Sequence, residues 1–536
     1  MAETIESTRV ASPRPEPWQP SFNPWLIAVV VAMAAFMEVL DTSIANVALP
    51  YIAGGLAASN SQSTWVLTSY LAANAIVLPI SGWLASRFGR KRFFILCILL
   101  FTGSSVLCGS APSLGVLILF RAVQGAGGGG LQPMAQAILA DTFPPQKRGM
   151  AFALYGITAV LAPTIGPTLG GWITYSYSWR WIFYINLPVG LLATFLVLRM
   201  VEDPPYLRER RNAGVRLDYI GLAFLAIGIG ALQVVLDKGQ EDDWFGSRMI
   251  LSLSVTAAIC LISLVVWEWL HRDPIMDLRL FKNFNFAAAN LMMFTLGVVY
   301  FSSLVLMPQL LQTLMGYTSE LAGLVLSASG AVLLVAMPFV GQLSGRVPAK
   351  YLIAFGWLLI GGAMFYSTKR IDLDISFNVA MWLRVAQTVG LPLLFVPINL
   401  ASYIGIRPEK SNDVSGMINF MRNIGSSVGT SMVTTILARR AQFHQSTLVY
   451  HATQYDPAFQ SQLNGLARQL VHSGTSVADA QTQARGLIYQ LLGGQSQTLS
   501  YLDAFMVLAA GAGIMFLLSF LIRRNDPRAG GEVAVG

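Results

Sequence analysis

The chain has 536 residues, of which 54% are hydrophobic and only 12% are charged. Soluble proteins carry about 25% charged residues, so the composition excludes a soluble protein of this size. A transmembrane helix needs about 20 apolar residues, and about 14 such helices would use just over half of the chain. The composition therefore predicts an all-α membrane protein with about 14 transmembrane helices.

Neither the N-terminus nor the cysteines indicate a secreted, disulfide-linked fold. The first 24 residues are polar and proline-rich without an apolar core, so we expect no cleavable signal peptide. The three cysteines, Cys97, Cys108 and Cys260, lie in apolar runs and lack the spacing of a metal site or a disulfide framework. We therefore expect no bound metal.

The apolar segments are continuous and long, which favours helices over the alternating strands of a barrel. The predicted spans are residues 25–50, 64–85, 93–110, 113–139, 150–175, 180–199, 218–236, 249–269, 285–313, 320–343, 351–368, 378–402, 413–437 and 503–522.

The basic residues predict the orientation of these helices. With the N-terminus in the cytoplasm, 23 of the 35 Lys and Arg residues lie in inside segments and nine lie outside. Cytoplasmic loops carry an excess of Lys and Arg, so both termini are predicted inside. The net charge of +8 is then explained by topology, without a nucleic-acid partner. The other three basic residues, Arg121, Arg384 and Arg422, fall within predicted spans.

Three short patterns recur in the same order at an offset of 259 to 263 residues. They start at Gly82 and Gly341 for G-x-L-x-x-R, at Arg121 and Arg384 for R-x-x-Q, and at Gly166 and Gly425 for G-x-x-x-G.

This offset makes helices one to six correspond to helices nine to fourteen, with helices seven and eight as an inserted pair. Two parallel six-helix halves are typical of the major facilitator fold, whose substrate sites lie between the halves. The predicted parts are a cytoplasmic tail 1–24, a first half 25–200, an inserted pair with flanking loops 201–270, a second half 271–522 that includes a periplasmic segment 439–502, and a cytoplasmic tail 523–536.

Five segments carry a family resemblance that covers nearly the whole chain. They are Leu40 to Pro50 in the first helix, Gly82 to Arg92 after the second, Leu117 to Gly128 in the fourth, Gly156 to Gly171 in the fifth, and Trp179 to Gly190. Together they resemble the 14-span drug:proton antiporters of the EmrB/QacA type within the major facilitator superfamily.

The resemblance implies a secondary transporter in the bacterial inner membrane rather than an enzyme. Within the family the likeness is closest to the EmrB-type inner-membrane pumps of tripartite efflux systems. It implies export of hydrophobic or amphipathic small molecules in exchange for protons, with no cofactor. It also implies a periplasmic membrane-fusion (adaptor) protein and, through it, an outer-membrane channel as partners.

Two carboxylates and one arginine are the candidates for proton coupling. Glu38 and Asp41 are three residues apart and share one face of the first helix. Charged groups inside a span are costly and usually functional, because burial disfavours their ionised form. We expect Asp41 to carry the proton, with Glu38 as a helper or substrate contact and Arg121 as the partner of Asp41. The alternative is a fixed ion pair between Asp41 and Arg121 that only holds helices together.

The loop after the second helix combines glycines that allow close approach with a basic cluster that can pair across the halves. We predict a conformational latch, with plain positive-inside topology as the alternative. The family motif has an acidic residue where this chain has Ser86, so a gating ion pair centred on that position must be absent or built differently. The candidate residues are Gly82, Arg87, Gly89, Arg90 and Lys91.

The fifth helix contains the small residues and prolines of an antiporter motif. Small residues permit close helix packing, and prolines permit bending. The resemblance implies a hinge and a seal against proton leak, and the alternative is a static packing face. The residues are Pro163, Gly166, Pro167, Gly170 and Gly171.

A substrate cavity for varied compounds would use methionine and aromatic side chains, which repack around different shapes. The candidate residues are Met33, Met37, Asn46, Gln132, Tyr300, Phe301 and Arg384.

The outside segment 439–502 is predicted to contain two amphipathic helices, within residues 442–497, with a turn near Gly474. We expect it to contact the adaptor; an autonomous cap without a partner is the alternative.

Two other functions remain open at this stage. One is dedicated export of a single endogenous product, such as a fatty acid or a siderophore. The other is a non-transporting membrane receptor or scaffold, against which the ionisable residues inside the spans argue.

Overall fold

The computed structural model describes residues 20–204, 218–271, 274–450, 452–453 and 455–522. The predicted tails, apart from residues 20–24, and the basic residues between 205 and 217 lie outside these ranges. Within them the chain is helical and contains no strand, as an all-α fold requires.

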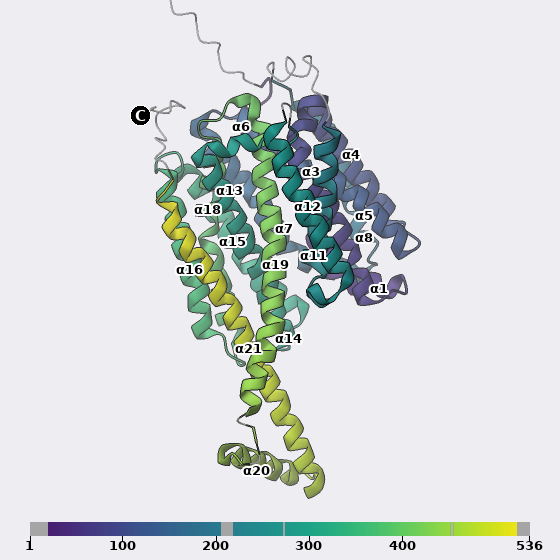
Figure 1. The fold of residues 1–536 in the computed structure, drawn as a ribbon, viewed down its shortest axis with the longest axis vertical. Helices are drawn as coiled ribbons and strands as arrows, with labels where there is room; N and C mark the ends of the chain where they lie inside the picture. Colours follow the sequence, from purple (N-terminus) through teal and green to yellow (C-terminus); the bar gives the residue numbers. More distant parts are fainter. Residues whose placement is uncertain (1–19, 205–217, 272–273, 451, 454, 523–536) are drawn as a thin grey trace, which may run out of the picture.

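The first six spans pack into one group of helices (Figure 1). Several spans consist of two consecutive helices that meet at a glycine or a short turn. The helices are α1 (Pro24–Gly55), α2 (Asn60–Ser63) with α3 (Trp65–Phe88), α4 (Arg90–Gly109), α5 (Leu114–Gly128) with α6 (Leu131–Thr142), α7 (Pro145–Ser176), and α8 (Trp181–Tyr184) with α9 (Asn186–Met200).

The last six spans form the second group and include a π-helical turn, η3, within the ninth span. The elements are η2 (Leu278–Lys282), α13 (Phe284–Leu296), η3 (Gly297–Phe301), α14 (Ser302–Thr313), α15 (Ser319–Leu343), α16 (Ala349–Arg370), α17 (Phe377–Val389), α18 (Leu391–Ser402), η4 (Pro408–Lys410), α19 (Ser411–Tyr450), α20 (Pro457–His472) and α21 (Val477–Ser519).

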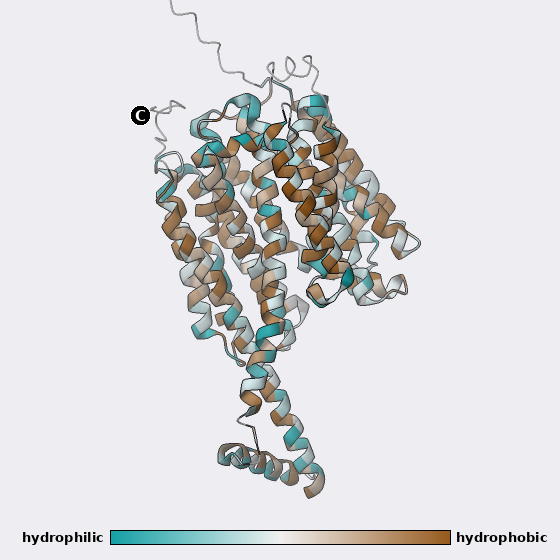
Figure 2. Cartoon of the chain, viewed as in Figure 1, coloured by the Kyte–Doolittle hydropathy of each residue, from teal (hydrophilic) through white to brown (hydrophobic). Residues whose placement is uncertain are grey.

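The inserted pair, α11 (Tyr219–Lys238) and α12 (Arg248–Leu270), is joined through the short turn η1 (Trp244–Gly246) and lies at the seam between the groups. Thr68 of α3 donates to Asp237, and Ser427 of α19 donates to Gln233 at 3.0 Å, so α11 contacts both groups. Helix α12 presents exposed apolar side chains such as Ile262, and Figure 2 shows both helices as predominantly hydrophobic. This surface suits contact with lipid.

Thirteen helical segments of the described chain are long and apolar enough to cross a membrane. The remaining predicted span, 413–437, lies within α19, which has 40 residues but carries Asp413, Arg422 and many Ser, Asn and Gly residues. It nevertheless packs inside the bundle against α3, α13 and α21. A helix surrounded by other helices can be this polar, because its polar groups meet protein rather than lipid.

The repeated glycines play the same role in both groups. A Cβ atom at Gly166 of α7 would collide with Ser43 of α1, and one at Gly425 of α19 would collide with the carbonyl oxygen of Phe294 in α13. The fifth and thirteenth spans therefore pack closely against the first and ninth spans, as the sequence repeat predicts.

The segment between the last two spans forms a hairpin that extends away from the bundle (Figure 1). The amphipathic helix α20 and the turn at Gly474, whose φ is 97°, agree with the prediction. The helix boundaries differ from it, because α19 continues to Tyr450 and α21 runs unbroken from Val477 to Ser519. Asp503 of α21 joins the two long helices by pairing with Arg440 at 2.6 Å and His444 at 2.7 Å. The hairpin is thus a direct extension of two spans.

The two ends of the bundle can be named from these features. The hairpin end carries α20, and the opposite, basic end carries the loop that contains Arg87, Gly89, Arg90 and Lys91.

We expect Gly425→Ala to lower the free energy of unfolding by about 1–3 kcal/mol, because the added methyl group collides with backbone of α13. Gly511→Ala in α21 is the matched control, since a Cβ atom there meets nothing within 4 Å. Both substitutions raise helix propensity by a similar amount. The difference in thermal stability between the two purified variants therefore reports the cost of the collision alone. Equal stability of the two variants would contradict the packing described for the repeat.

Candidate functional site

Asp41 lies in α1 at the centre of a buried ion-pair network. Its Oδ2 atom is 2.5 Å from Nη1 of Arg121, and its side chain is 1% exposed. Gln124 and Asn186 each donate an amide N–H to Oδ1, at 2.9 and 2.7 Å. The Asp41 carboxylate therefore contacts one cation and two neutral donors.

Arg121 has further contacts with α3, although its Nη2 atom has no hydrogen-bond partner in the described structure. Its Nε atom donates to the carbonyl oxygen of Val66 at 3.2 Å, and its guanidinium lies 4.3 Å from the centre of the Tyr70 ring. The network thus ties together α1, α3, α5 and α9 of the first half.

Glu38 lies one turn before Asp41 but has a different environment. The Tyr70 hydroxyl and the Asn74 amide each donate to Oε1 at 3.1 Å, and the Gln132 amide donates to Oε2. The side chain is 4% exposed. Among the residues whose side chains are described, no Lys or Arg lies within 4.0 Å of this carboxylate. Glu38 is therefore a buried acid with neutral donors only.

Gln132 connects Glu38 to the second half. Its Oε1 atom accepts hydrogen bonds from Arg422 of α19 and, at 3.1 Å, from the Tyr155 hydroxyl. One amide side chain thus separates an acid of the first half from an arginine of the second half.

A second amide chain crosses the halves beside it. Gln136 of α6 donates to Oδ1 of Asn399 in α18 at 3.1 Å and accepts from Nδ2 of Asn419 in α19 at 2.7 Å. Gln136 and Asn399 are 263 residues apart and correspond in the repeat. Our sequence analysis missed these amides, although polar residues within apolar spans are themselves a signal.

At the basic end Arg90 combines an ion pair within the first half with a hydrogen bond to the second half, close to the predicted latch. Arg90 pairs with Asp141 of α6 at 2.7 Å, and its Nε donates to Asn412 of α19 at 2.8 Å. Ser86, which replaces the acidic residue of the family motif, instead donates to the carbonyl oxygen of Gly82 at 2.9 Å. The ion pair of this chain is therefore built on Arg90 and Asp141.

The other motif residues at this end have separate positions. A Cβ atom at Gly82 would lie 2.5 Å from Oδ1 of Asp413, so this glycine allows α3 to approach α19. Gly89 has a φ of 90° in the turn between α3 and α4. Lys91 donates to the Leu198 carbonyl oxygen at 2.7 Å, whereas Arg87 is exposed.

The motif of the fifth span packs against α1. Gly166 and Gly170 face Ser43 and Ile44, whereas a Cβ atom at Gly171 would meet nothing within 4 Å. Helix α7 is continuous through Pro163 and Pro167, which are both half-buried. The Pro163 carbonyl oxygen, freed from part of the helical ladder, accepts from Ser43 at 3.3 Å.

The predicted cavity residues do not gather at one place. Gln132 lies between the halves, Met37 is buried in the core, Met33 is half-buried, and Asn46 is exposed.

Tyr300, Phe301 and Arg384 lie within the second half, where the rings of Tyr300 and Phe301 are 5.3 Å apart. Tyr300 and Arg384 are buried and Phe301 is half-buried. Only Gln132 of the candidates thus contacts the networks of Glu38 and Arg422 directly.

The sequence matches that of a known family. A model of the Major Facilitator Superfamily matches residues 31–430. The multidrug export protein EmrB of Escherichia coli K12 is 36% identical over 508 residues, which cover 94% of this chain and 96% of that protein. The fatty acid resistance protein FarB of Neisseria gonorrhoeae is 37% identical over 454 residues, covering 84% and 88%.

A solved structure is similar in fold. The major facilitator proton:xylose symporter XylE superposes with a TM-score of 0.60 at 15% identity, covering 95% of this chain and 98% of that chain.

Arg90→Gln should weaken the contact between the halves at the basic end, because it removes the hydrogen bond from Nε of Arg90 to Asn412 and the ion pair that holds Arg90 against Asp141. A hydrogen bond from a charged donor contributes about 1.5–3 kcal/mol. In a cysteine-free background, cysteines at Gln146 of α7 and Gly345 after α15 should cross-link, since a Cβ atom at Gly345 lies 3.5 Å from the Gln146 carbonyl oxygen. We expect at least a fivefold slower cross-linking rate in Arg90→Gln, consistent with such a loss.

Arg87→Gln is the control, because it removes the same charge from the same loop at an exposed position. If both variants cross-linked at the unmodified rate, Arg90 would have no latch role.

Proposed function

This chain belongs to the major facilitator superfamily, within its EmrB type of efflux transporters, and we propose that it exports hydrophobic or amphipathic compounds in exchange for protons. It is a multi-pass membrane protein and a transporter rather than an enzyme. The proposal adds the proton coupling, the substrate class, the inner-membrane location with both termini in the cytoplasm, and the tripartite partners.

The environment of Glu38 is the observation that supports proton coupling. This side chain is buried, and its described partners are neutral donors. Acids buried within spans mark the proton pathways of pumps and transporters, and among the described side chains Glu38 makes no ion pair within 4.0 Å that proton uptake would break. Asp41, in contrast, is held in an ion pair with Arg121 that links α1 to α5. We therefore place the exchanged proton on Glu38 first, with Asp41 and Arg121 positioning α1 around it.

The hydrogen bonds of Gln132 suggest how protonation would act on the halves. Ionised Glu38 accepts from the Gln132 amide, whose Oε1 accepts from Arg422 across the interface. Protonation removes the charge that orients this amide and weakens the connection. The halves can then move apart around the central site, as alternating access requires.

Substrates of the proposed class would meet both apolar and amide groups at this interface. Arg422 lies 5.8 Å from the Phe395 ring and beside Tyr155 through Gln132, so aromatic and polar contacts are adjacent. A few directed polar groups among apolar side chains are typical of small-molecule sites.

Dedicated export of one amphipathic acid is the second candidate. It is favoured by the relative whose name links it to fatty acid resistance, which is as similar to this chain as the multidrug exporter. Membership of an efflux family argues against the receptor or scaffold.

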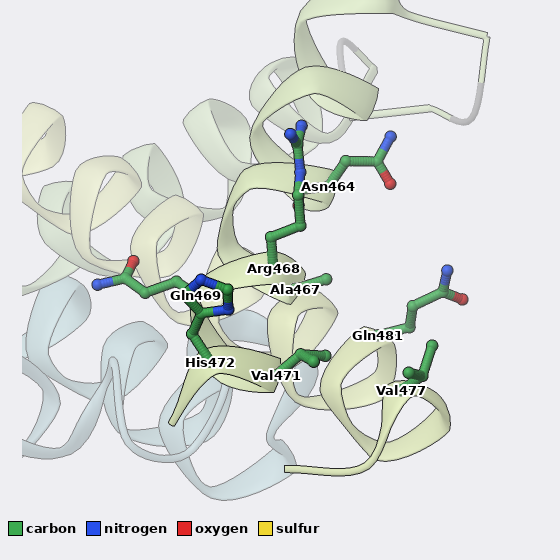
Figure 3. Close-up of a pocket in the computed structure, with 8 residues that line it drawn as sticks. All are labelled: Asn464, Ala467, Arg468, Gln469, Val471, His472, Val477 and Gln481. Carbon is green, nitrogen blue, oxygen red and sulfur yellow. The ribbon is translucent and has the colours of Figure 1, made fainter. Parts of the chain in front are cut away.

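The hairpin is proposed to contact the periplasmic adaptor, and through it an outer-membrane channel. Leu463 and Ala467 of α20 pack on Ala484 and Ile488 of α21. Beside them the two helices form an open groove with a volume of about 730 Å³. Figure 3 shows Val471 of α20 and Val477 of α21 among its lining residues. Val477 is 70% exposed, which leaves apolar surface for a partner.

Glu38→Gln should abolish pH-gradient-driven export in proteoliposomes, because the amide keeps the shape but cannot exchange a proton. We expect export of a panel of amphipathic compounds to fall at least 100-fold, while binding is retained within about tenfold. Asp41→Asn leaves Arg121 buried without its carboxylate, so it should lower both export and thermal stability.

Unchanged proton-coupled export by Glu38→Gln would remove Glu38 from the mechanism. If Asp41→Asn exchanged protons for substrate at the normal rate, Asp41 could not be a coupling site either.

Val477→Asp should reduce co-purification of the full-length chain with its adaptor at least tenfold, because it places a charge in the apolar groove. Gly486→Ala is the control, since it lies on the same helix and a Cβ atom there meets nothing within 4 Å. Unreduced co-purification, also after removal of residues 452–476, would show that the hairpin does not hold the adaptor.

A further inference from the structure

Arg384 of α17 is a fully buried cation without a described carboxylate beside it. Its side chain is 0% exposed. Its Nη1 atom donates to Ser303 Oγ at 2.9 Å and to Gln387 Oε1 at 3.5 Å, and both acceptors are neutral. Among the residues whose side chains the structure describes, no Asp or Glu lies within 4.0 Å of its guanidinium. A buried charge that lacks a counter-charge is strongly unfavourable.

The internal repeat shows what the second half lacks. Arg384 corresponds to Arg121 at an offset of 263 residues, and Ser303 corresponds to Asp41 at an offset of 262. In the first half the carboxylate of Asp41 neutralises the arginine at 2.5 Å. In the second half the corresponding side chain is the hydroxyl of Ser303. The second half therefore keeps the arginine but has no carboxylate at this position.

One neutral acceptor of the network is repeated in the second half. Gln387 Nε2 donates to Ser367 Oγ at 2.9 Å, and Asn186 Nδ2 donates to Ser105 Oγ at 3.0 Å in the first half. Ser367 and Ser105 correspond at the same offset of 262 residues. A serine thus accepts from an amide at the same position of both halves, although the amide belongs to α17 in the second half and to α9 in the first.

Two buried polar atoms at this position have no hydrogen-bond partner in the described structure. They are Nε of Arg384 and the hydroxyl of Tyr300, whose ring centre lies 5.8 Å from the Arg384 guanidinium. Tyr300 lies in η3, and Ser303 lies in the first turn of α14. Single π-helical turns within α-helices occur frequently at functional sites. The corresponding part of α1 is a regular helix, so the distortion belongs to the half without the carboxylate.

We propose that the second half binds a monovalent anion beside Arg384, with the Tyr300 hydroxyl as a further donor. The anion supplies the charge that Asp41 supplies in the first half. A guanidinium binds carboxylates and other anions through several directed N–H groups. A small inorganic anion and the carboxylate head group of an amphipathic acid share this chemistry, and the full burial of Arg384 favours a small ligand.

The test measures thermal unfolding of the purified full-length chain while chloride replaces gluconate at constant ionic strength. We expect a saturable rise of the unfolding temperature. Tyr300→Phe should raise the half-saturating concentration about tenfold or more, because it removes one donor to a charged ligand. Arg384→Gln should abolish the response, and Arg87→Gln, which removes an exposed charge, should leave it unchanged.

Ser303→Asp is the decisive variant, because it installs the carboxylate that the first half has at this position. We expect it to fold in gluconate at least as stably as the unmodified chain and to have lost the anion response. It also keeps the proposal testable if Arg384→Gln fails to fold.

Acetate and octanoate distinguish the two sources of the anion. A saturable response to chloride and acetate assigns a small-anion site, and a response to octanoate alone assigns a head-group site. The proposal is overturned if none of the three ions gives a saturable response, or if the response persists in Ser303→Asp. Because the assay needs no transport, its outcome is independent of whether export is coupled to protons.

Discussion

A charge inside a membrane-embedded helix bundle must be compensated by other groups of the bundle, because lipid offers neither water nor counter-ions. The three arginines within the spans illustrate three solutions. Arg121 has a carboxylate, Arg422 has the carbonyl oxygen of an amide that also contacts an acid, and Arg384 has a hydroxyl. The packing of the helices follows these pairings, since each one links helices that are distant in the sequence.

The two halves share a fold but differ in their ionisable groups. The glycines that let the fifth and thirteenth spans approach the first and ninth are retained in both. The acids are not, because Glu38 and Asp41 correspond to Tyr300 and Ser303. Proton exchange is therefore proposed for the first half alone, while the second half supplies Arg422 and the amides that contact it. This division lets a proton on one half alter the connection to the other.

The sequence predicted the helices well, because long apolar runs and the repeat are local or periodic signals. It also predicted the pairing of Asp41 with Arg121, since few ionisable residues lie within the spans. It ranked Asp41 above Glu38 as the proton carrier, and it could not show how their surroundings differ, because the partners of Glu38, Tyr70, Asn74 and Gln132, come from other helices. The continuous helix from Val477 to Ser519 was also missed, since its polar first part resembles a separate segment.

The sequence by itself determined that the chain spans a membrane, that it is built from two related halves, and which few charged residues lie inside. Composition and periodicity suffice for these properties, because the bilayer imposes the same apolar length on every helix. Only the tertiary structure decided which charges are neutralised. That outcome depends on the angstrom-scale placement of side chains from separate helices, such as Arg90 beside Asp141 and Arg384 beside Ser303.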